Sequence, residues 1–106
     1  MNINPFDLLK NAQKIQEQMG SLQEKLGTLQ VTGSAGGGMA EVDMNGRMEV
    51  LAVRIAPEAA EDVQILQDLI KAAFTNASEK AREAIRVEMG AMAGGLGLPP
   101  GFPGLG

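Results

Sequence analysis

The sequence contains no cysteine, histidine, tryptophan or tyrosine among its 106 residues. The absence of cysteine excludes disulfides and thiolate chemistry, and it suits a reducing cytoplasm. Histidine is the usual general base and a common zinc ligand, so the chain lacks the residues that most enzyme sites and transition-metal sites need. The sequence therefore predicts a non-enzymatic protein with no metal, no cofactor and no small-molecule substrate.

Long hydrophobic runs and an excess of positive charge are also missing. No stretch reaches the roughly 20 apolar residues of a membrane-spanning helix, and the N-terminus lacks the basic and then apolar order of a signal peptide, so we expect a cytoplasmic protein with no membrane partner. The net charge of −4 excludes a uniformly basic nucleic-acid-binding surface. Any DNA site has to be a local patch of lysine and arginine, and composition alone favours an ordinary acidic surface.

A heptad pattern dominates the N-terminal segment. Apolar residues recur at alternating steps of four and three, and we call this set the apolar seam: Leu8, Ala12, Ile15, Met19, Leu22, Leu26 and Leu29. The pattern predicts an amphipathic helix over residues 5–27, capped by Asn4 with Pro5 at its first position. We expect the apolar seam to pack on the second helix of the same chain, with an intermolecular coiled coil as the alternative.

Two turn signals divide the middle of the chain into three strands. A strand over residues 29–33 leads into the glycine-rich segment 33–38, which lacks the lysine of a phosphate-binding loop and favours a hairpin turn. Alternating apolar residues predict a second strand over residues 40–44, and Asn45-Gly46 predicts a type I′ hairpin.

The third strand, over residues 48–55, is apolar on both faces. Two helices in one chain cannot cover all of it, so the sheet is the surface that we expect to bind a second copy. We place Met19, Met44 and Met48 in the core, where methionine commonly fills gaps between larger side chains.

A second long helix is predicted over residues 61–92. At about 1.5 Å per residue it is longer than a three-stranded sheet is wide, so its C-terminal half should extend beyond the sheet. The glycine- and proline-rich residues 94–106 predict a mobile tail in which Leu96, Leu98 and Phe102 could dock. The chain thus divides into one domain, residues 1–93, and the tail, residues 94–106.

Two pairs of basic residues are candidates for contacts with phosphate. Lys10 and Lys14 are four positions apart and off the apolar seam, and Arg82 and Arg86 are paired in the same way on the second helix. The alternative is an ordinary solvated helix face, because Glu79 and Glu83 lie near the second pair.

Four stretches of the chain resemble the YbaB/EbfC nucleoid-associated family. They are LLKNAQKIQEQM, VTGSAGGGMAEVDMNG, ILQDLIKAAFTNASEKA and GGLGLPPGF, in this order. The resemblance implies an α+β fold of order α-β-β-β-α, with a three-stranded antiparallel meander and two long helices. It also implies a homodimer whose helices project like the arms of tweezers.

The resemblance further implies a bacterial protein of the nucleoid that binds double-stranded DNA, shapes the nucleoid and influences transcription. It adds positions on the second helix to the two basic pairs, and Lys25 completes the candidates. The full set is Lys10, Lys14, Lys25, Lys71, Lys80, Arg82 and Arg86. With so few basic residues we expect weak, salt-sensitive and largely sequence-independent binding. The alternatives are a prefoldin-like holdase and a module that docks a protein partner.

Overall fold

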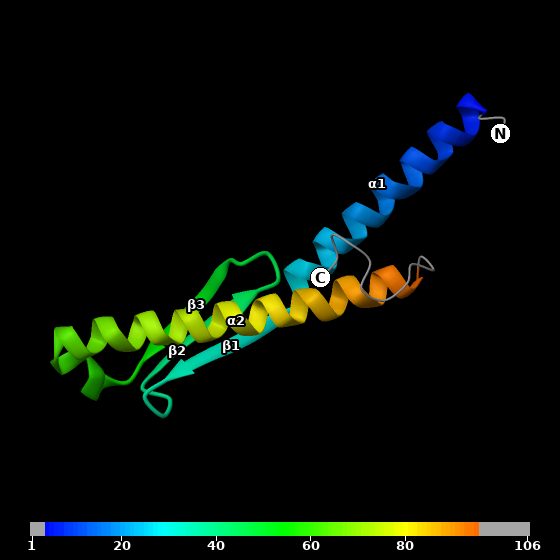
Figure 1. Cartoon of the computed structure of the whole chain (residues 1–106). Helices are drawn as coiled ribbons and strands as arrows, with labels where there is room; N and C mark the ends of the chain where they lie inside the picture. The colour runs from blue at the N-terminus through cyan, green and yellow to red at the C-terminus, as the bar shows by residue number, and fades with distance from the viewer. Residues whose placement is uncertain (1–3, 96–106) are drawn as a thin grey trace.

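The computed structural model describes residues 4–95 of an elongated molecule of about 69 × 23 × 17 Å. The elements are α1 (Pro5–Thr28), β1 (Gln30–Ala35), β2 (Ala40–Asn45), β3 (Val50–Ile55), the 3-10 helix η1 (Pro57–Glu61) and α2 (Val63–Gly95). This is the predicted α-β-β-β-α order of the α+β class. In Figure 1, α2 runs along the sheet and continues beyond it, as predicted, and α1 projects from the same end of the sheet.

The three strands form the predicted antiparallel meander in the order β1-β2-β3. The first turn contains Gly36, Gly37 and Gly38, which all have positive φ, as the glycine-rich segment predicts. β1 continues to Ala35, two residues beyond its predicted end, because Ala35 pairs with Ala40 at the start of β2. Only residues 36–39 are left for the turn.

The second turn is not the predicted type I′ hairpin. Positive φ occurs at Met48 rather than at Asn45 or Gly46. Asn45 ends β2, and its Oδ1 accepts hydrogen bonds from the backbone N–H groups of Arg47 (2.9 Å) and Glu49 (3.1 Å). The side chain of Asn45 therefore closes a longer turn over residues 46–49, and β3 begins two residues later than predicted.

The core lies between α2 and the strands β1 and β2. Three residues of β2 and three alanines of α2 form it: Ala40, Val42, Met44, Ala73, Ala77 and Ala81. The small side chains allow a close approach, and a Cβ on Gly33 of β1 would overlap the backbone nitrogen of Ala77. α2 thus packs directly on the backbone of β1.

The prediction that three methionines lie in the core is right for Met44 and wrong for the other two. Met44 is fully buried, whereas Met19 and Met48 are exposed. Met19 is on α1 and Met48 is in the second turn, and both lie outside the contact between α2 and the sheet.

α1 has nearly the predicted bounds, with Asn4 Oδ1 accepting a hydrogen bond from the N–H of Phe6 (2.9 Å). The predicted packing of its apolar seam on the second helix is wrong. Ile15 and Met19 are more than half exposed, and Leu26 is the buried residue of the helix. The reason is that α1 leaves the sheet at an angle to α2 (Figure 1), and the α1 side chains that line the cleft between the two helices are mainly polar, with Leu22 as the one seam residue among them.

α2 begins two residues later than predicted because Asp62 caps it, with Oδ1 accepting from the N–H of Ile65 (3.1 Å). It continues to Gly95, into the first two residues of the predicted tail. The rest of that tail, including Leu96, Leu98 and Phe102, lies outside the described residues. Within residues 4–95, no helix has a stretch that is long and apolar enough to span a membrane.

Candidate nucleic-acid interface

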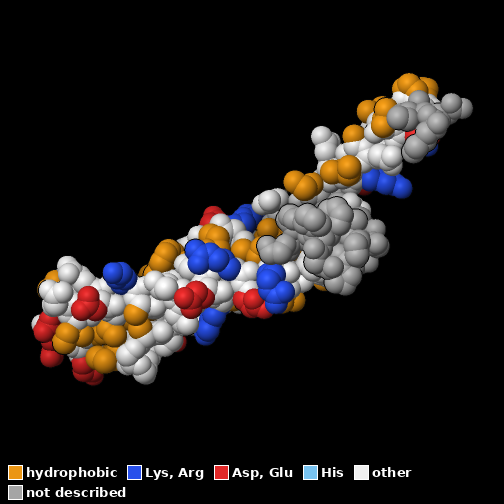
Figure 2. Space-filling model, in the orientation of Figure 1, with side chains coloured by type: hydrophobic (Ala, Val, Ile, Leu, Met, Phe, Trp, Pro, Cys, Tyr) orange, Lys and Arg blue, Asp and Glu red, His pale blue; other side chains and the backbone are white. Residues whose placement is uncertain are grey.

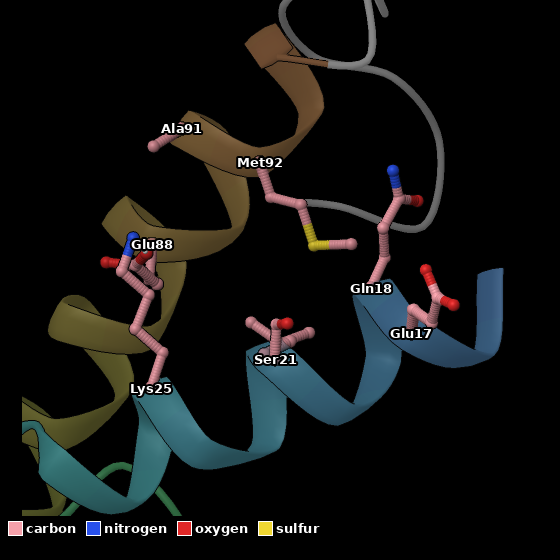
Figure 3. Close-up of a pocket in the computed structure, with 8 residues that line it drawn as sticks. Glu17, Gln18, Ser21, Lys25, Glu88, Ala91 and Met92 are labelled. Atoms are coloured by element: carbon pink, nitrogen blue, oxygen red, sulfur yellow. Dashed lines mark ion pairs between the residues drawn. The ribbon is translucent and has the colours of Figure 1, made fainter. Parts of the chain in front are cut away.

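α1 and the C-terminal part of α2 form the two walls of a cleft of about 510 Å³ (Figure 3). The wall from α1 is mainly polar and includes Gln18, Ser21 and Lys25. The wall from α2 includes Glu88, whose carboxylate lies 2.7 Å from the Nζ atom of Lys25. This ion pair joins the two helices near the point where α1 leaves the sheet.

Lys10 and Lys14 continue the polar wall of α1 away from the sheet. Eleven residues of an α-helix make about three turns, so residues eleven apart share one face. Lys10 is eleven positions before Ser21, and Lys14 is eleven positions before Lys25. We call the exposed face that carries Lys10 and Lys14 the arm surface.

A second group of cations lies on the side of α2 that faces away from the core. Lys71 and Arg82 are eleven positions apart, and Arg86 follows one turn later. We call this face the outer α2 surface. Acidic residues are interleaved with these cations, and Figure 2 shows red and blue side chains alternating along the helix. Glu83 pairs with Arg86 at 2.6 Å, and this hydrogen bond holds the pKa of Glu83 below its ordinary value.

Lys80 is bonded within the fold. Its Nζ atom donates a hydrogen bond to the carbonyl oxygen of Thr32 (2.9 Å), and Asn76 Oδ1 accepts one from the N–H of Ser34 (3.0 Å). Both α2 side chains thereby bond the outer edge of β1, where no further strand pairs. Lys80 therefore occupies part of the unpaired edge of β1 in this protomer.

Four of the seven candidate cations form neither a salt bridge nor a side-chain hydrogen bond within residues 4–95. They are Lys10, Lys14, Lys71 and Arg82. The structure does not gather the seven residues into one patch, because the arm surface faces the cleft and the outer α2 surface faces away from it. A protomer thus presents two separate cationic surfaces.

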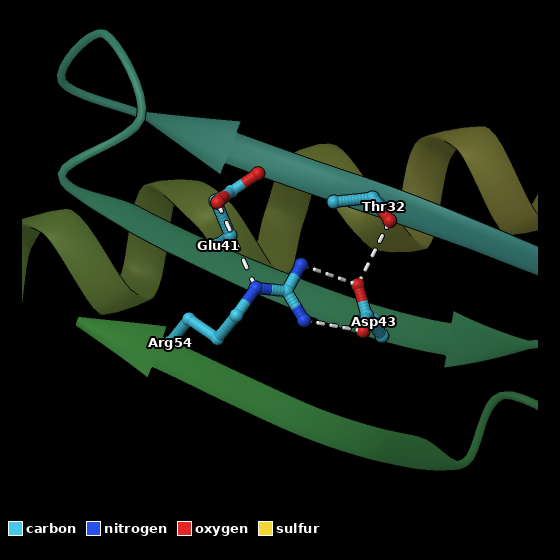
Figure 4. A network of polar contacts seen from close by, with 4 residues as sticks. All are labelled: Thr32, Glu41, Asp43 and Arg54. Carbon is cyan, nitrogen blue, oxygen red and sulfur yellow. Dashed lines mark hydrogen bonds and ion pairs between the residues drawn. The ribbon is translucent and has the colours of Figure 1, made fainter.

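The remaining arginines hold the fold together. On the sheet face away from α2, Arg54 of β3 donates hydrogen bonds to both carboxylate oxygens of Asp43 (2.6 and 2.9 Å), and Thr32 Oγ1 donates a third to Asp43 (2.8 Å), as Figure 4 shows. These bonds, above all the two from Arg54, lower the pKa of Asp43 to about 2. Arg47 donates from Nε and Nη2 to the carbonyl oxygen of Gln23 in α1. Residue spacing gave no signal for either contact.

β3 is the uncovered edge of the sheet. α2 lies over β1 and β2, and Val50, Leu51 and Val53 of β3 are each about half exposed. This agrees with the prediction that the third strand needs cover from outside the chain.

Comparisons with known proteins show the family to which the chain belongs. The model of the YbaB/EbfC DNA-binding family matches residues 1–96. A nucleoid-associated protein of Dictyoglomus thermophilum is 44% identical over 93% of this chain and 97% of its own length. One of Xylella fastidiosa is 45% identical over 96% and 95%.

Among solved structures, an uncharacterized protein from Helicobacter pylori has a similar fold, with a TM-score of 0.75 and 22% identity over 86% of this chain and 98% of its own. The family match spans all of the α-β-β-β-α unit, and the prefoldin-like alternative finds no support among these relatives. The chain belongs to the YbaB/EbfC DNA-binding family.

Proposed function

We propose that this chain is a nucleoid-associated protein that binds double-stranded DNA through the arm surface and the outer α2 surface. The observation that carries the proposal is that Lys10, Lys14, Lys71 and Arg82 have no partner within residues 4–95, so each is available to a phosphate. Its family membership and the names of its relatives support the same function. The function needs no catalysis, and its setting is the bacterial cytoplasm, at the nucleoid, where binding would shape the DNA and influence transcription.

Binding should be weak, salt-sensitive and largely independent of DNA sequence. Phosphate contacts carry no sequence information, and bidentate arginines are the commonest readers of guanine. Arg47 and Arg54 are bonded within the fold, and Arg86 is paired with Glu83. In the described part of the chain, Arg82 is thus the arginine that remains available to contact a base. One arginine is not enough to recognise a DNA sequence.

The active form is a homodimer in which a second copy covers the apolar seam and β3. Leu26 is the last residue of the seam within α1, and its carbonyl oxygen accepts a hydrogen bond from the N–H of Gly46 (2.8 Å) in the turn before β3. The end of α1 therefore lies beside the turn that leads into β3, and a two-fold axis that brings a second copy against α1 and β3 would bury the seam and the strand on each copy. Dimerisation doubles both the free cations and the net negative charge, so its benefit for DNA binding is that one duplex can contact the cations of both copies.

The test measures binding to a random-sequence duplex by fluorescence anisotropy over a range of salt concentrations. The slope of log K against log salt has a magnitude of about 0.9 for each phosphate that the protein neutralises. We expect the double variants Lys10→Ala/Lys14→Ala and Lys71→Ala/Arg82→Ala each to weaken binding and flatten this slope. Gln13→Ala/Gln16→Ala on the same helix is the matched control and should change neither quantity.

If the folded wild-type protein shows no binding even at low salt, the DNA-binding proposal is wrong for this chain. A protein partner that survives nuclease treatment in a pull-down would then favour the docking module.

A further inference from the structure

Phe6 is the most exposed large apolar side chain in residues 4–95, with 74% of its surface accessible. It occupies the first turn of α1, at the far end of the projecting helix. The backbone at this point is held by the cap, since the N–H of Phe6 donates to Asn4 Oδ1. A fixed helix end therefore presents a bare aromatic ring to solvent.

Phe6 lies on the arm surface and not on the apolar seam. Residues 6, 10 and 14 follow one another at steps of four, so Phe6, Lys10 and Lys14 form one row along the helix. Leu8 of the seam is two positions from Phe6, which places it about 200° around the helix. A second copy that covers the seam would leave Phe6 exposed beside the two lysines.

We propose that Phe6 is an apolar wedge that enters the minor groove of DNA and partly unstacks a base step, while Lys10 and Lys14 hold the neighbouring phosphates. This inference rests on the proposed function and adds the mode of contact. Phenylalanine is among the side chains that proteins insert between base steps from the minor groove, which kinks the duplex by roughly 20–90°. A wedge would also give an acidic protein an attraction to DNA that does not depend on charge.

The dimensions of the row fit this arrangement. One step of four residues is about 6 Å along the helix, and the minor groove of B-DNA is about 6 Å wide. A lysine one turn away from an inserted ring would thus reach a phosphate at the groove border. Pyrimidine–purine steps are the expected sites, because they unstack most easily.

The absence of tryptophan and tyrosine from the sequence allows a direct test. Phe6→Trp introduces a single indole, and we expect its emission to be quenched on titration with duplex DNA, because the ring stacks on bases. Val63→Trp is the matched control, since Val63 is also exposed but lies at the opposite end of α2 from the arm. Its emission should not change.

Phe6→Ala tests the consequence for the DNA. We expect a roughly tenfold loss of affinity and a smaller bend, measured by energy transfer between dyes at the two duplex ends. The slope of log K against log salt should stay at the wild-type value, because no phosphate contact is removed. This combination separates a wedge from a charged contact.

Three results would overturn the wedge. Phe6→Ala could leave affinity and bend unchanged while Lys10→Ala/Lys14→Ala still flattens the salt slope, in which case the proposed function stands without the wedge. The emission of Phe6→Trp could be unaffected by DNA that the variant still binds. Phe6→Ala could convert the dimer to monomers in sedimentation, which would assign the ring to the contact between copies.

Discussion

At the scale of single residues, Gly33 is the position where the fold has least room for a side chain. A Cβ there would overlap the nitrogen of Ala77 and the carbonyl oxygen of Ala73, and it would lie 2.6 Å from the Cα atom of Ala77. All three are backbone atoms of α2, which cannot rotate away as a side chain would. We predict that Gly33→Ala pushes α2 off the sheet and lowers the free energy of unfolding by about 1–3 kcal/mol, measured by urea denaturation.

Gly20→Ala is the control for this prediction, because an added Cβ at Gly20 on exposed α1 meets no atom within 4 Å. Alanine favours a helix over glycine by about 0.5–1 kcal/mol, so this variant should be at least as stable as the wild type. Equal stability of the two variants would mean that α2 does not rest on the backbone of β1.

Asp43 makes stability depend on pH. Its pKa is about 2 in the folded protein, below the ordinary 3.8, because Arg54 and Thr32 donate hydrogen bonds to the carboxylate. The unfolded chain therefore takes up the proton first as the pH falls, and the stabilisation from the charged carboxylate is complete above the ordinary pKa and lost toward pH 2. We predict that the stability difference between wild type and Asp43→Asn is largest at neutral pH and shrinks as the pH approaches 2.

Urea midpoints at a series of pH values between 7 and about 2 check this prediction. Asp68→Asn, an exposed acid on α2 outside the network, is the control. A difference between wild type and Asp43→Asn that stays constant over the whole range would contradict the charged pair with Arg54.

At the scale of elements, α1 depends on few contacts with the rest of the protomer. Arg47 is the main anchor, since its guanidinium donates two hydrogen bonds, of 3.1 and 2.9 Å, to the carbonyl oxygen of Gln23. We predict that Arg47→Ala speeds amide hydrogen exchange in residues 23–28 and costs about 1 kcal/mol of stability. Lys14→Ala, farther out on the same helix, should change neither. Unchanged exchange in Arg47→Ala would show that the burial of Leu26 and the ion pair between Lys25 and Glu88 are enough to hold the helix end.

Elements with a local cause could be predicted from the sequence. Asn4 and Pro5 mark the start of α1, and the glycines that take positive φ mark the first turn, because each depends on residues close in the chain. The second turn differs from its prediction because Asn45 uses its side chain, and not its backbone conformation, to close it.

Contacts between distant residues could not be predicted in this way. Periodicity correctly placed Lys10 and Lys14 on an exposed face, but a heptad pattern is the same whether the apolar seam packs within the chain or against another copy. The bond from Lys80 to Thr32, 48 positions away, follows from how α2 lies over β1, and no spacing in the sequence encodes it. Phe6 could have been found by continuing the Lys10–Lys14 row one step back.

At the scale of the whole molecule, the proposed dimer covers the exposed apolar seam and the exposed β3, so charge placed on either surface should separate the two copies. Ile15 is 59% and Val53 49% exposed in the protomer. We predict that Ile15→Glu and Val53→Glu each convert a dimer to monomers in sedimentation experiments, because burying an unpaired carboxylate costs more than the apolar contact returns.

Val63→Glu is the control: Val63 is 65% exposed but lies on neither surface, so its variant should stay dimeric. The melting temperature of the wild type should rise with protein concentration, and that of the two monomeric variants should not. If Val53→Glu alone dissociates the dimer, the second copy pairs through β3 and leaves the seam of α1 open.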